Sequence, residues 1–177
     1  MRIIRGTHSK KRIIAPNNLP VRPTTDMAKE ALFNILDNYV YFEDLEVLDL
    51  FAGTGNISYE FGSRGSQKIV SVDLSPFCVK FMNETRHALG FENNMQVIQG
   101  DVFEFLQKHQ GKYDLIFADP PYDLENIEEI YDFVIENNLL KEDGMLIIEH
   151  PQGVDLSHKE KFKDHRKYGK VHFTFFE

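Results

Sequence analysis

The sequence Asp119-Pro120-Pro121-Tyr122 combines an acid, two prolines and an aromatic residue directly after an apolar run that ends at Ala118. Proline fixes φ, so the two prolines should hold a rigid turn that directs the Asp119 carboxylate and the Pro120 carbonyl toward one point. Two acceptors at one point suit the two N–H groups of a planar exocyclic amine, and Tyr122 offers a flat face for base stacking. A strand merely stopped by prolines would need neither the acid nor the aromatic residue. We therefore predict that Asp119 to Tyr122 form the catalytic group.

An exocyclic amine is a poor nucleophile because its lone pair is delocalised into the ring. Acceptors on both N–H groups favour a pyramidal nitrogen whose lone pair is free to attack, and a carboxylate already in place stabilises the positive charge that develops. Transfer of a methyl group from a sulfonium then needs mainly correct positioning. Asp119 is therefore expected to stabilise charge, and no strong general base is required.

The segment from Asp49 to Gly55 places an acid near the end of a predicted strand and two glycines in the turn that follows. Glycine lets the backbone turn sharply and approach a ligand that a Cβ atom would exclude. A dinucleotide fingerprint would need a third glycine where Ser58 stands, and a Walker loop would need a lysine that is absent. An acid before an amide-rich turn suits a ligand with an ammonium group and no phosphate, such as S-adenosylmethionine. We expect Asp49, Phe51, Gly53 and Gly55 to bind this cofactor.

Acids also end the next two predicted strands. Asp73 lies about 20 residues after Gly53, the offset at which an acid in such folds binds both ribose hydroxyls. Asp101 could accept a hydrogen bond from an adenine amino group, with Leu74 and Val102 closing on the two faces of the ring. Each acid also has a simpler interpretation, because Asp73 precedes a predicted helix and Asp101 could cap one. Three acids at the ends of successive strands are more informative together than separately.

Short apolar runs alternate with helical segments over most of the chain, a pattern that predicts a parallel sheet with right-handed crossovers. The predicted strands are 46–51, 68–73, 95–99, 113–118, 145–149 and 171–176, and the predicted helices are 55–64, 76–89, 102–109 and 125–137, after a first helix with apolar positions between 28 and 36. The last strand follows residues 162–168 after the single Gly169, a link too short for a crossover, so it should run antiparallel. The fold class is therefore α/β.

The formal net charge of −8 is unevenly distributed. Residues 1–25 hold basic residues and no acid, and they contain two Arg-Ile-Ile triplets that predict a short hairpin. We expect this basic arm to contact an RNA backbone, and the candidate residues are Arg2, Arg5, Lys10, Lys11 and Arg12. The alternative is that these side chains only form a solvated surface. A second basic cluster, at residues 159–170, is left without an assigned partner.

The chain of 177 residues, of which 42% are hydrophobic, is expected to form one structural domain, with residues 1–42 as arm and helix packed on a core of residues 43–177. No apolar run approaches the roughly 18 to 20 residues of a membrane span, and the first residues lack the apolar region of a signal peptide. We expect a cytoplasmic protein without a membrane partner. Its single cysteine, Cys78, excludes an internal disulfide, and we expect no metal site.

Four segments together resemble the RsmD family of bacterial methyltransferases: Arg22-Pro23-Thr24, residues 28–36, the Asp49 to Gly55 loop and the Asp119 to Tyr122 turn. The similarity runs from the Arg-Ile-Ile start to residues 168–173. It implies a class I S-adenosylmethionine-dependent methyltransferase (Rossmann-like) fold with seven strands, mostly parallel with the last one antiparallel, and an amino-terminal extension of a β-hairpin and a helix. It also implies that Arg22 and Thr24 lie near the methionine end of the cofactor.

The resemblance further implies methyl transfer to the exocyclic N2 of one guanine, guanine 966, in small-subunit (16S) ribosomal RNA. Residues 26–177 carry an excess of acids, which is unusual for an RNA-binding protein because it weakens the attraction to phosphate. A substrate already partly or fully assembled into small subunits would offer protein surfaces for binding as well. Two alternatives stay open. One is an amino methyltransferase for adenine or cytosine in DNA, which usually needs a larger recognition region than residues 1–42. The other is a non-catalytic RNA-binding module that serves ribosome assembly.

Overall fold

The computed structural model describes residues 1–21 and 24–177. Its helices and strands, in chain order, are α1 (Asp26–Leu36), the 3-10 helix η1 (Phe42–Asp44), β1 (Glu46–Leu50), α2 (Asn56–Ser63), β2 (Lys68–Asp73), α3 (Pro76–Ala88), β3 (Met95–Gln99), α4 (Val102–Lys108), β4 (Tyr113–Ala118), α5 (Glu128–Glu136), β5 (Leu140–His150), β6 (Phe162–Tyr168) and β7 (Val171–Phe176). Within these described ranges, no helix has both the length and the apolar character needed to cross a membrane.

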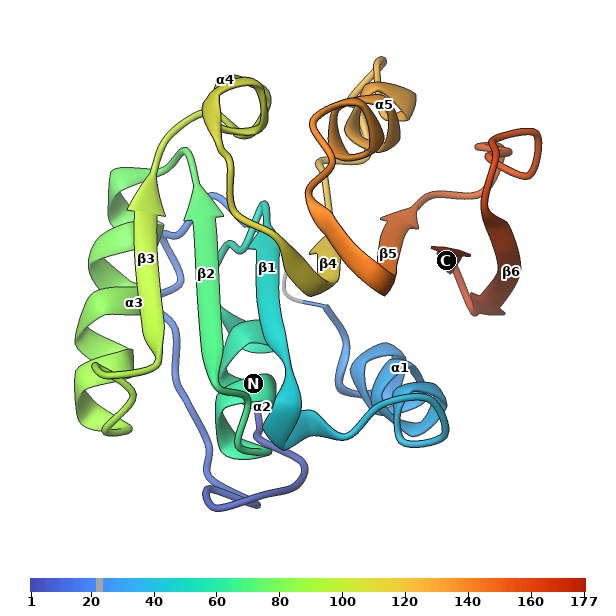
Figure 1. Ribbon diagram of the computed structural model, residues 1–177. Helices are drawn as coiled ribbons and strands as arrows, with labels where there is room; N and C mark the ends of the chain where they lie inside the picture. Colours follow the sequence, from blue (N-terminus) through green and yellow to red (C-terminus); the bar gives the residue numbers. More distant parts are fainter. Residues whose placement is uncertain (22–23) are drawn as a thin grey trace.

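The seven strands form one sheet in the order β3-β2-β1-β4-β5-β7-β6 (Figure 1). Neighbouring strands are parallel from β3 to β5, whereas β7 runs antiparallel to both β5 and β6. The predicted α/β class and the mostly parallel sheet with an antiparallel last strand are therefore confirmed. The strand order reverses between β1 and β4, and ligands of open α/β sheets bind outside the carboxyl ends of the strands at such a point.

Three predicted strand boundaries differ from the structure, one of them only in that β5 ends at His150 and not at Glu149. The first strand ends one residue before Phe51, because Phe51 adopts a left-handed φ of 59° that does not continue a strand. The fifth strand begins at Leu140, well before the predicted residue 145. Leu140 pairs with Tyr113, and the register then shifts before the regular pairing that includes Met145. Polar residues in this irregular part of β5 hide the strand in the sequence.

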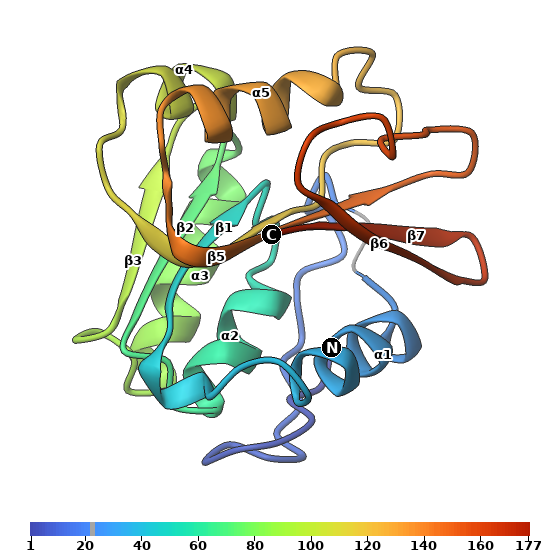
Figure 2. The ribbon, with the colours of Figure 1, turned by 45° about the vertical axis from the view of Figure 1, so that its right-hand side comes forward.

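Helices cover both faces of the sheet, with α1, α2 and α3 on one face and α4 and α5 on the other (Figure 2). Successive side chains of a strand point to opposite faces, so each strand contributes to two apolar clusters. The cluster under α1 to α3 contains Val47, Phe117 and Ile147, and the cluster under α4 and α5 contains Leu48, Ile116 and Ile148. Residues two positions further along each strand share these faces.

Side chains cap the first turns of α1, α3 and α4. The Thr25 side chain accepts from the N–H of Ala28 at the start of α1, and the Ser75 side chain accepts from the N–H of Cys78 at the start of α3. Proline follows Ser75 at the first helical position, where its missing N–H has no intrahelical partner to lose. These local signals explain why the helix starts are close to the predicted ones.

The amino-terminal segment forms the predicted hairpin. Arg2 and Arg12 make an antiparallel bridge, and Ile3 and Ile13 are buried in the cluster that lies under α1 to α3. The N–H of Thr7 donates to the carbonyl of Ser63 at 2.7 Å, which ties the hairpin to the end of α2. Because the hairpin, α1 and the sheet share one apolar cluster, the division at residues 42 and 43 remains a prediction.

Candidate active site

Three acids lie at the carboxyl ends of three neighbouring strands, beside the reversal of strand order. Asp49 is near the end of β1, Asp119 directly follows β4, and Glu149 is near the end of β5. By the alternation of each strand, all three side chains are expected on the face that α1 to α3 cover. Asp49 and Glu149 are buried and Asp119 is half-buried. The structure thus brings together two predicted site residues and one acid that the sequence analysis missed.

Asp49 has a hydroxyl as its hydrogen-bond partner. The Ser58 hydroxyl donates to Asp49 Oδ2 at 2.5 Å, and the Ser58 and Ser71 hydroxyl oxygens lie 2.7 Å apart. Burial raises the pKa of Asp49 to about 7, and the charges of Asp119 and Asp73 act in the same direction, whereas the hydrogen bond from Ser58 opposes the shift. No cation of the described residues pairs with Asp49, so a positively charged ligand would stabilise its carboxylate.

Asp119 and Glu149 are close enough for the charge of one acid to act on the other. The Thr24 hydroxyl donates to Asp119 Oδ2 at 3.3 Å, and the Tyr122 hydroxyl donates to Glu149 Oε1 at 3.5 Å. Burial raises the pKa of Asp119, and burial together with the charge of Asp119 raises the pKa of Glu149. Two like charges at such a place repel each other, so N–H donors from a ligand would stabilise the pair.

The acids at the strand ends lie on adjacent strands of one face. Over residues 1–21 and 24–177, no group of three or more His, Cys, Asp or Glu side chains is arranged to hold a metal. Asp49 pairs in register with Phe117, two residues before Asp119, so the two acids follow each other on adjacent strands of one face. A cation beside Asp49 and an amine beside Asp119 could therefore occupy neighbouring positions.

The loop after β1 contains three residues with positive φ. Phe51 has φ 59°, Gly53 has φ 56° and Gly55 has φ 80° at the first position before α2. A Cβ on Gly55 would lie 2.6 Å from Tyr59 Cζ, so this glycine is required by packing of the protein on itself. The strained, non-glycine φ of Phe51 at a strand end is a feature common at functional sites. Cofactor binding by Phe51, Gly53 and Gly55 remains a prediction.

We expect Gly55→Ala to lower the free energy of unfolding by about 2 to 5 kcal/mol, because it adds both a left-handed alanine and an overpacked methyl group. Urea unfolding monitored by circular dichroism measures this difference. Gly90→Ala is the matched control, since Gly90 has φ 72° but no atom within 4 Å of the added Cβ. An equal loss in both variants would show that packing against Tyr59 contributes nothing.

Asp73 connects the glycine loop to the start of α3. The N–H of Gly53 donates to Asp73 Oδ2 at 2.8 Å, and the N–H of Ser75 donates to Oδ1 at 2.9 Å. Asp73 therefore helps to start α3, the simpler of the two roles that its position in the sequence allows. Each carboxylate oxygen retains a second lone pair, so the bonds to the backbone are compatible with ribose binding, which stays a prediction.

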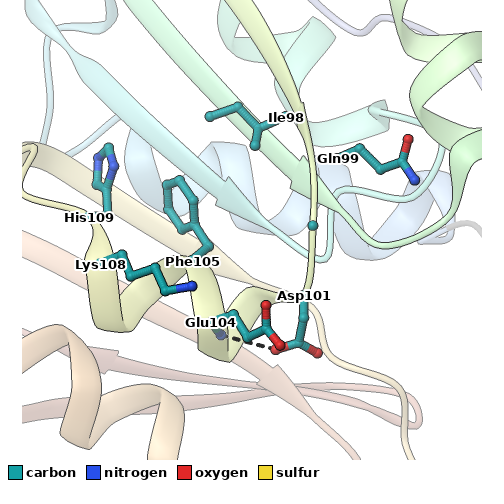
Figure 3. Close-up of a pocket in the computed structure, with 8 residues that line it drawn as sticks. Ile98, Gln99, Asp101, Glu104, Phe105, Lys108 and His109 are labelled. Atoms are coloured by element: carbon teal, nitrogen blue, oxygen red, sulfur yellow. Dashed lines mark hydrogen bonds between the residues drawn. The ribbon is translucent and has the colours of Figure 1, made fainter.

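Asp101 caps α4 by accepting from the N–H of Glu104 at 3.0 Å. A cavity of about 290 Å³ lies beside it along the edge strand β3 and α4 (Figure 3). The cavity is lined by Ile98, Gln99, Gly100, Asp101, Glu104, Phe105, Lys108 and His109. Val102 is buried in the cluster under α4 and α5, whereas Leu74 is 65% exposed. The adenine contacts expected of Asp101, Leu74 and Val102 remain predictions.

Val21 and Thr24, which precede α1, lie against the glycine loop and the Asp119 to Tyr122 turn. A Cβ on Gly53 would be 3.4 Å from Val21 Cγ1, and Thr24 contacts Asp119. Arg22, expected near the methionine end of the cofactor, lies outside the described residues. Thr24 is therefore beside the predicted reaction centre, and its contact with the cofactor remains a prediction.

A buried polar network that the sequence analysis missed includes the backbone of Thr24. The Lys29 Nζ lies 3.3 Å from Glu60 Oε2 and donates to Asn56 Oδ1 at 2.8 Å. Asn56 in turn donates to the Thr24 carbonyl at 3.4 Å, and Arg64 pairs with Glu60 at 3.0 Å. Burial lowers the pKa of Lys29, and the charge of Glu60 opposes that shift. The network links α1 and α2 beneath the segment that carries Thr24.

The hairpin tip of the basic arm, around His8, lies at the opposite end of the strands from the acids. Arg2 pairs with Asp26 at 3.8 Å and Arg5 with Asp37 at 2.8 Å, whereas the side chains of Lys10, Lys11 and Arg12 are exposed. The His8 ring contacts the ring of Phe91, which precedes β3, so the hairpin tip is at the amino ends of the strands (Figure 1). RNA contact by the arm remains a prediction, and it would be made at some distance from the target base.

Glu149 carries a signal that was available in the sequence. It follows the apolar run Met145 to Ile148, just as Asp49 and Asp119 follow apolar positions near the ends of β1 and β4. An acid at the carboxyl end of a predicted parallel strand is therefore a signal for a site residue. The Lys29 network gave no comparable signal, because its members come from separate helices.

The strand order and the acids at the carboxyl ends define the class I methyltransferase fold. A solved structure titled "Putative methyltransferase yhhF from Escherichia coli" matches with a TM-score of 0.85 and 23% identity, covering 99% of this chain and 96% of that chain. The chain belongs to the family described as "Conserved hypothetical protein 95", whose model matches residues 1–177. The resemblance to the RsmD family is thereby confirmed.

Two curated relatives carry names that refer to ribosomal RNA. "Putative rRNA methyltransferase YlbH" of Bacillus subtilis is 31% identical over 159 residues, which cover 88% of this chain and 85% of the relative. "Ribosomal RNA small subunit methyltransferase D" of Haemophilus influenzae is 30% identical over 152 residues, covering 84% of this chain and 78% of the relative.

Proposed function

We propose that the protein transfers a methyl group from S-adenosylmethionine to the exocyclic N2 of a guanine in small-subunit ribosomal RNA, guanine 966 by resemblance. The observation that carries the proposal is the half-buried acid Asp119, which follows β4 at the reversal of strand order with Tyr122 in the same turn. The names of the relatives support ribosomal RNA as the substrate class.

The residues present fit S-adenosylmethionine. Asp49 is a buried acid without a cationic partner among the described residues, and the glycine loop beside it lacks the sequence of a phosphate-binding loop. An ammonium group would find its charge complement at Asp49, and Asp73 and Asp101 lie at the ends of the next two strands for the nucleoside part. When bound, the cofactor supplies an electrophilic methyl group on a sulfonium.

The turn from Asp119 to Tyr122 binds and orients the target base. Asp119 and the Pro120 carbonyl accept from the two N–H groups of the amine, and Tyr122 stacks on the base. Transfer would break the bond between the methyl carbon and the sulfonium sulfur, whose electron pair would remain on the sulfur, while the nitrogen bonds that carbon. The positive charge left on the nitrogen would be stabilised by the Asp119 carboxylate. One amine proton leaves afterwards to solvent. The target base must leave its stack to reach this turn, which is easiest in an RNA loop.

The net negative charge of the protein favours a substrate in which the RNA is already bound by ribosomal proteins. With a formal charge of −8, the protein as a whole is repelled by phosphate. A small subunit that already carries ribosomal proteins offers other surfaces for docking, and an enzyme of this kind works in the cytoplasm. The proposal is tested by incubating the protein with labelled S-adenosylmethionine and unmethylated small subunits. One labelled N2-methylguanine in 16S RNA is expected, whereas label in adenine or in DNA would refute the RNA assignment.

Binding of S-adenosylmethionine should release about one proton near pH 6. The pKa of Asp49 is raised to about 7 in the free protein, and a cationic ligand binds the charged carboxylate. Below pH 7 the proton must leave before the pair forms, so affinity should fall about fivefold from pH 7 to pH 6 and about tenfold for each further pH unit. Calorimetry in buffers with different ionisation enthalpies counts the released proton. A constant affinity from pH 6 to pH 8 would contradict the role of Asp49.

Replacing Lys10, Lys11 and Arg12 together by serine should weaken binding to small subunits and reduce its salt dependence. Each lost phosphate contact lowers the slope of log K against log salt by about 0.7 to 0.9, so three contacts give about 2 to 3. The measurement is a filter-binding titration at several salt concentrations.

The matched control is the triple replacement of Lys161, Lys167 and Lys170 by serine, which removes the same charge from exposed positions of the second basic cluster. If both triples reduce the slope equally, binding follows net charge and the arm has no special role.

A further inference from the structure

Glu149 is a buried acid to which the proposed reaction has so far given no task. It is 3% exposed, and its Oε2 atom is buried without a hydrogen-bond partner among the described residues. Its other oxygen, Oε1, accepts from the Tyr122 hydroxyl at a long 3.5 Å. A buried acceptor that lacks a donor is costly in a folded protein, so its presence indicates that a donor arrives from a ligand.

Glu149 lies beside the place of the reacting amine. Ala118 pairs in register with Ile148, so Asp119 and Glu149 directly follow a paired position on neighbouring strands. The charge of Asp119 acts on Glu149, and the Tyr122 hydroxyl contacts it. An acceptor of Glu149 and the acceptors of the Asp119 turn are therefore side by side.

We propose that Glu149 Oε2 accepts the ring N1–H of the target guanine while Asp119 and the Pro120 carbonyl hold its N2 amine, and that this contact selects guanine over adenine and cytosine. The inference rests on the proposed function. The entering base replaces the long contact from the Tyr122 hydroxyl as the tyrosine ring turns to stack on it. Glu149 is then a specificity-determining residue that touches the substrate.

The selection follows from the edges of the bases. In guanine the ring position next to the exocyclic amine carries an N–H donor. In adenine and cytosine the corresponding nitrogen carries a lone pair, which the carboxylate form of Glu149 repels. Because burial and the charge of Asp119 raise the pKa of Glu149 to about 9, the preference for guanine should increase as the pH rises toward that value. The Asp-Pro-Pro-Tyr turn alone accepts the amine of any of the three bases, so a second acceptor is what distinguishes guanine.

The test uses 2-aminopurine, which keeps the 2-amino group of guanine but has a lone pair at N1. Small subunits that carry either guanine or 2-aminopurine at the methylated position are compared by kcat/KM. The wild-type protein should prefer guanine by about 10- to 100-fold. Glu149→Leu should lose activity on guanine and show a preference below about threefold, because the contact with N1–H is absent. The ratio of the two substrates does not depend on the fraction of folded enzyme.

Two further variants complete the test. Glu149→Gln can present either its acceptor oxygen or its N–H donors to the base, so its preference for guanine should fall between those of the wild-type protein and Glu149→Leu. Glu142→Leu, on an exposed position of the same strand, should leave the preference unchanged. A wild-type protein that methylates guanine N2 but uses 2-aminopurine equally well would overturn this inference while leaving the proposed function intact. An unchanged preference in Glu149→Leu would overturn it as well. If the wild-type protein methylates no guanine N2 at all, the proposed function itself fails.

Discussion

Asp119→Ala should lower kcat for methyl transfer by about 10²- to 10³-fold and leave the Kd for S-adenosylmethionine within about threefold of the wild-type value. Asp119 follows β4, accepts from the Thr24 hydroxyl at 3.3 Å, and belongs to the turn that receives the amine. In the proposed reaction its carboxylate stabilises the charge that develops on nitrogen, an interaction made in the transition state. Single-turnover kinetics with saturating cofactor, together with calorimetry of cofactor binding, measure the two quantities separately.

The matched control for this prediction is Asp123→Asn, an exposed acid of the same loop, which should leave kcat unchanged. The variant protein should also remain folded. Burial raises the pKa of Asp119, so the charged form costs stability as pH rises through that raised value, and removing the acid should not lower the melting temperature at pH 8. Loss of cofactor binding together with loss of transfer would show that Asp119 belongs to the cofactor site instead.

Asp49→Asn should have the opposite signature, raising the Kd for S-adenosylmethionine by about 30- to 1000-fold with a much smaller change in kcat at saturating cofactor. Asp49 is 1% exposed and receives a hydrogen bond from Ser58, so a ligand ammonium group meets its charge in a place with little solvent. Removing one partner of a buried charge pair typically costs about 2 to 5 kcal/mol of binding. The asparagine keeps the shape of the side chain and removes the charge.

Ser71→Ala provides the control for Asp49→Asn, because Ser71 contacts Ser58 but has no charge to offer a ligand. It should change the Kd by less than about fivefold, the range of one neutral hydrogen bond. The Asp49→Asn variant should also release no proton on cofactor binding near pH 6. An unchanged Kd in this variant would mean that the ammonium group binds elsewhere.

Local patterns account for the parts of the fold that the sequence predicted well. The strands β1 to β4 are Val-, Ile- and Leu-rich runs bounded by glycine, proline or acids, and their ends were predicted to within about one residue. The early start of β5 was missed because its first residues are polar and pair through a shifted register with β4. The positive φ of Phe51 ends β1 and has no signal in its residue type.

The candidate site divides in the same way. Asp49 and the Asp119 to Tyr122 turn are contiguous motifs, so their chemistry could be predicted from residue types and spacing. The role of Glu149 depends on its position beside Asp119, which follows the neighbouring strand β4. The buried pair of Lys29 and Glu60 depends on the packing of α1 against α2. Contacts between residues that are distant in sequence are set by tertiary packing. Nothing in the sequence indicated that the hairpin tip around His8 lies at the amino ends of the strands.

A crystal structure of the protein with S-adenosylhomocysteine tests the central claim most directly. We predict the ammonium group at Asp49 and the sulfur facing the Asp119 carboxylate and the Pro120 carbonyl, with a gap wide enough for a planar amine whose nitrogen can come within about 3 to 3.5 Å of the transferred carbon. The account would be contradicted if these two oxygens pointed away from the sulfur, or if side chains of the protein filled the space between them.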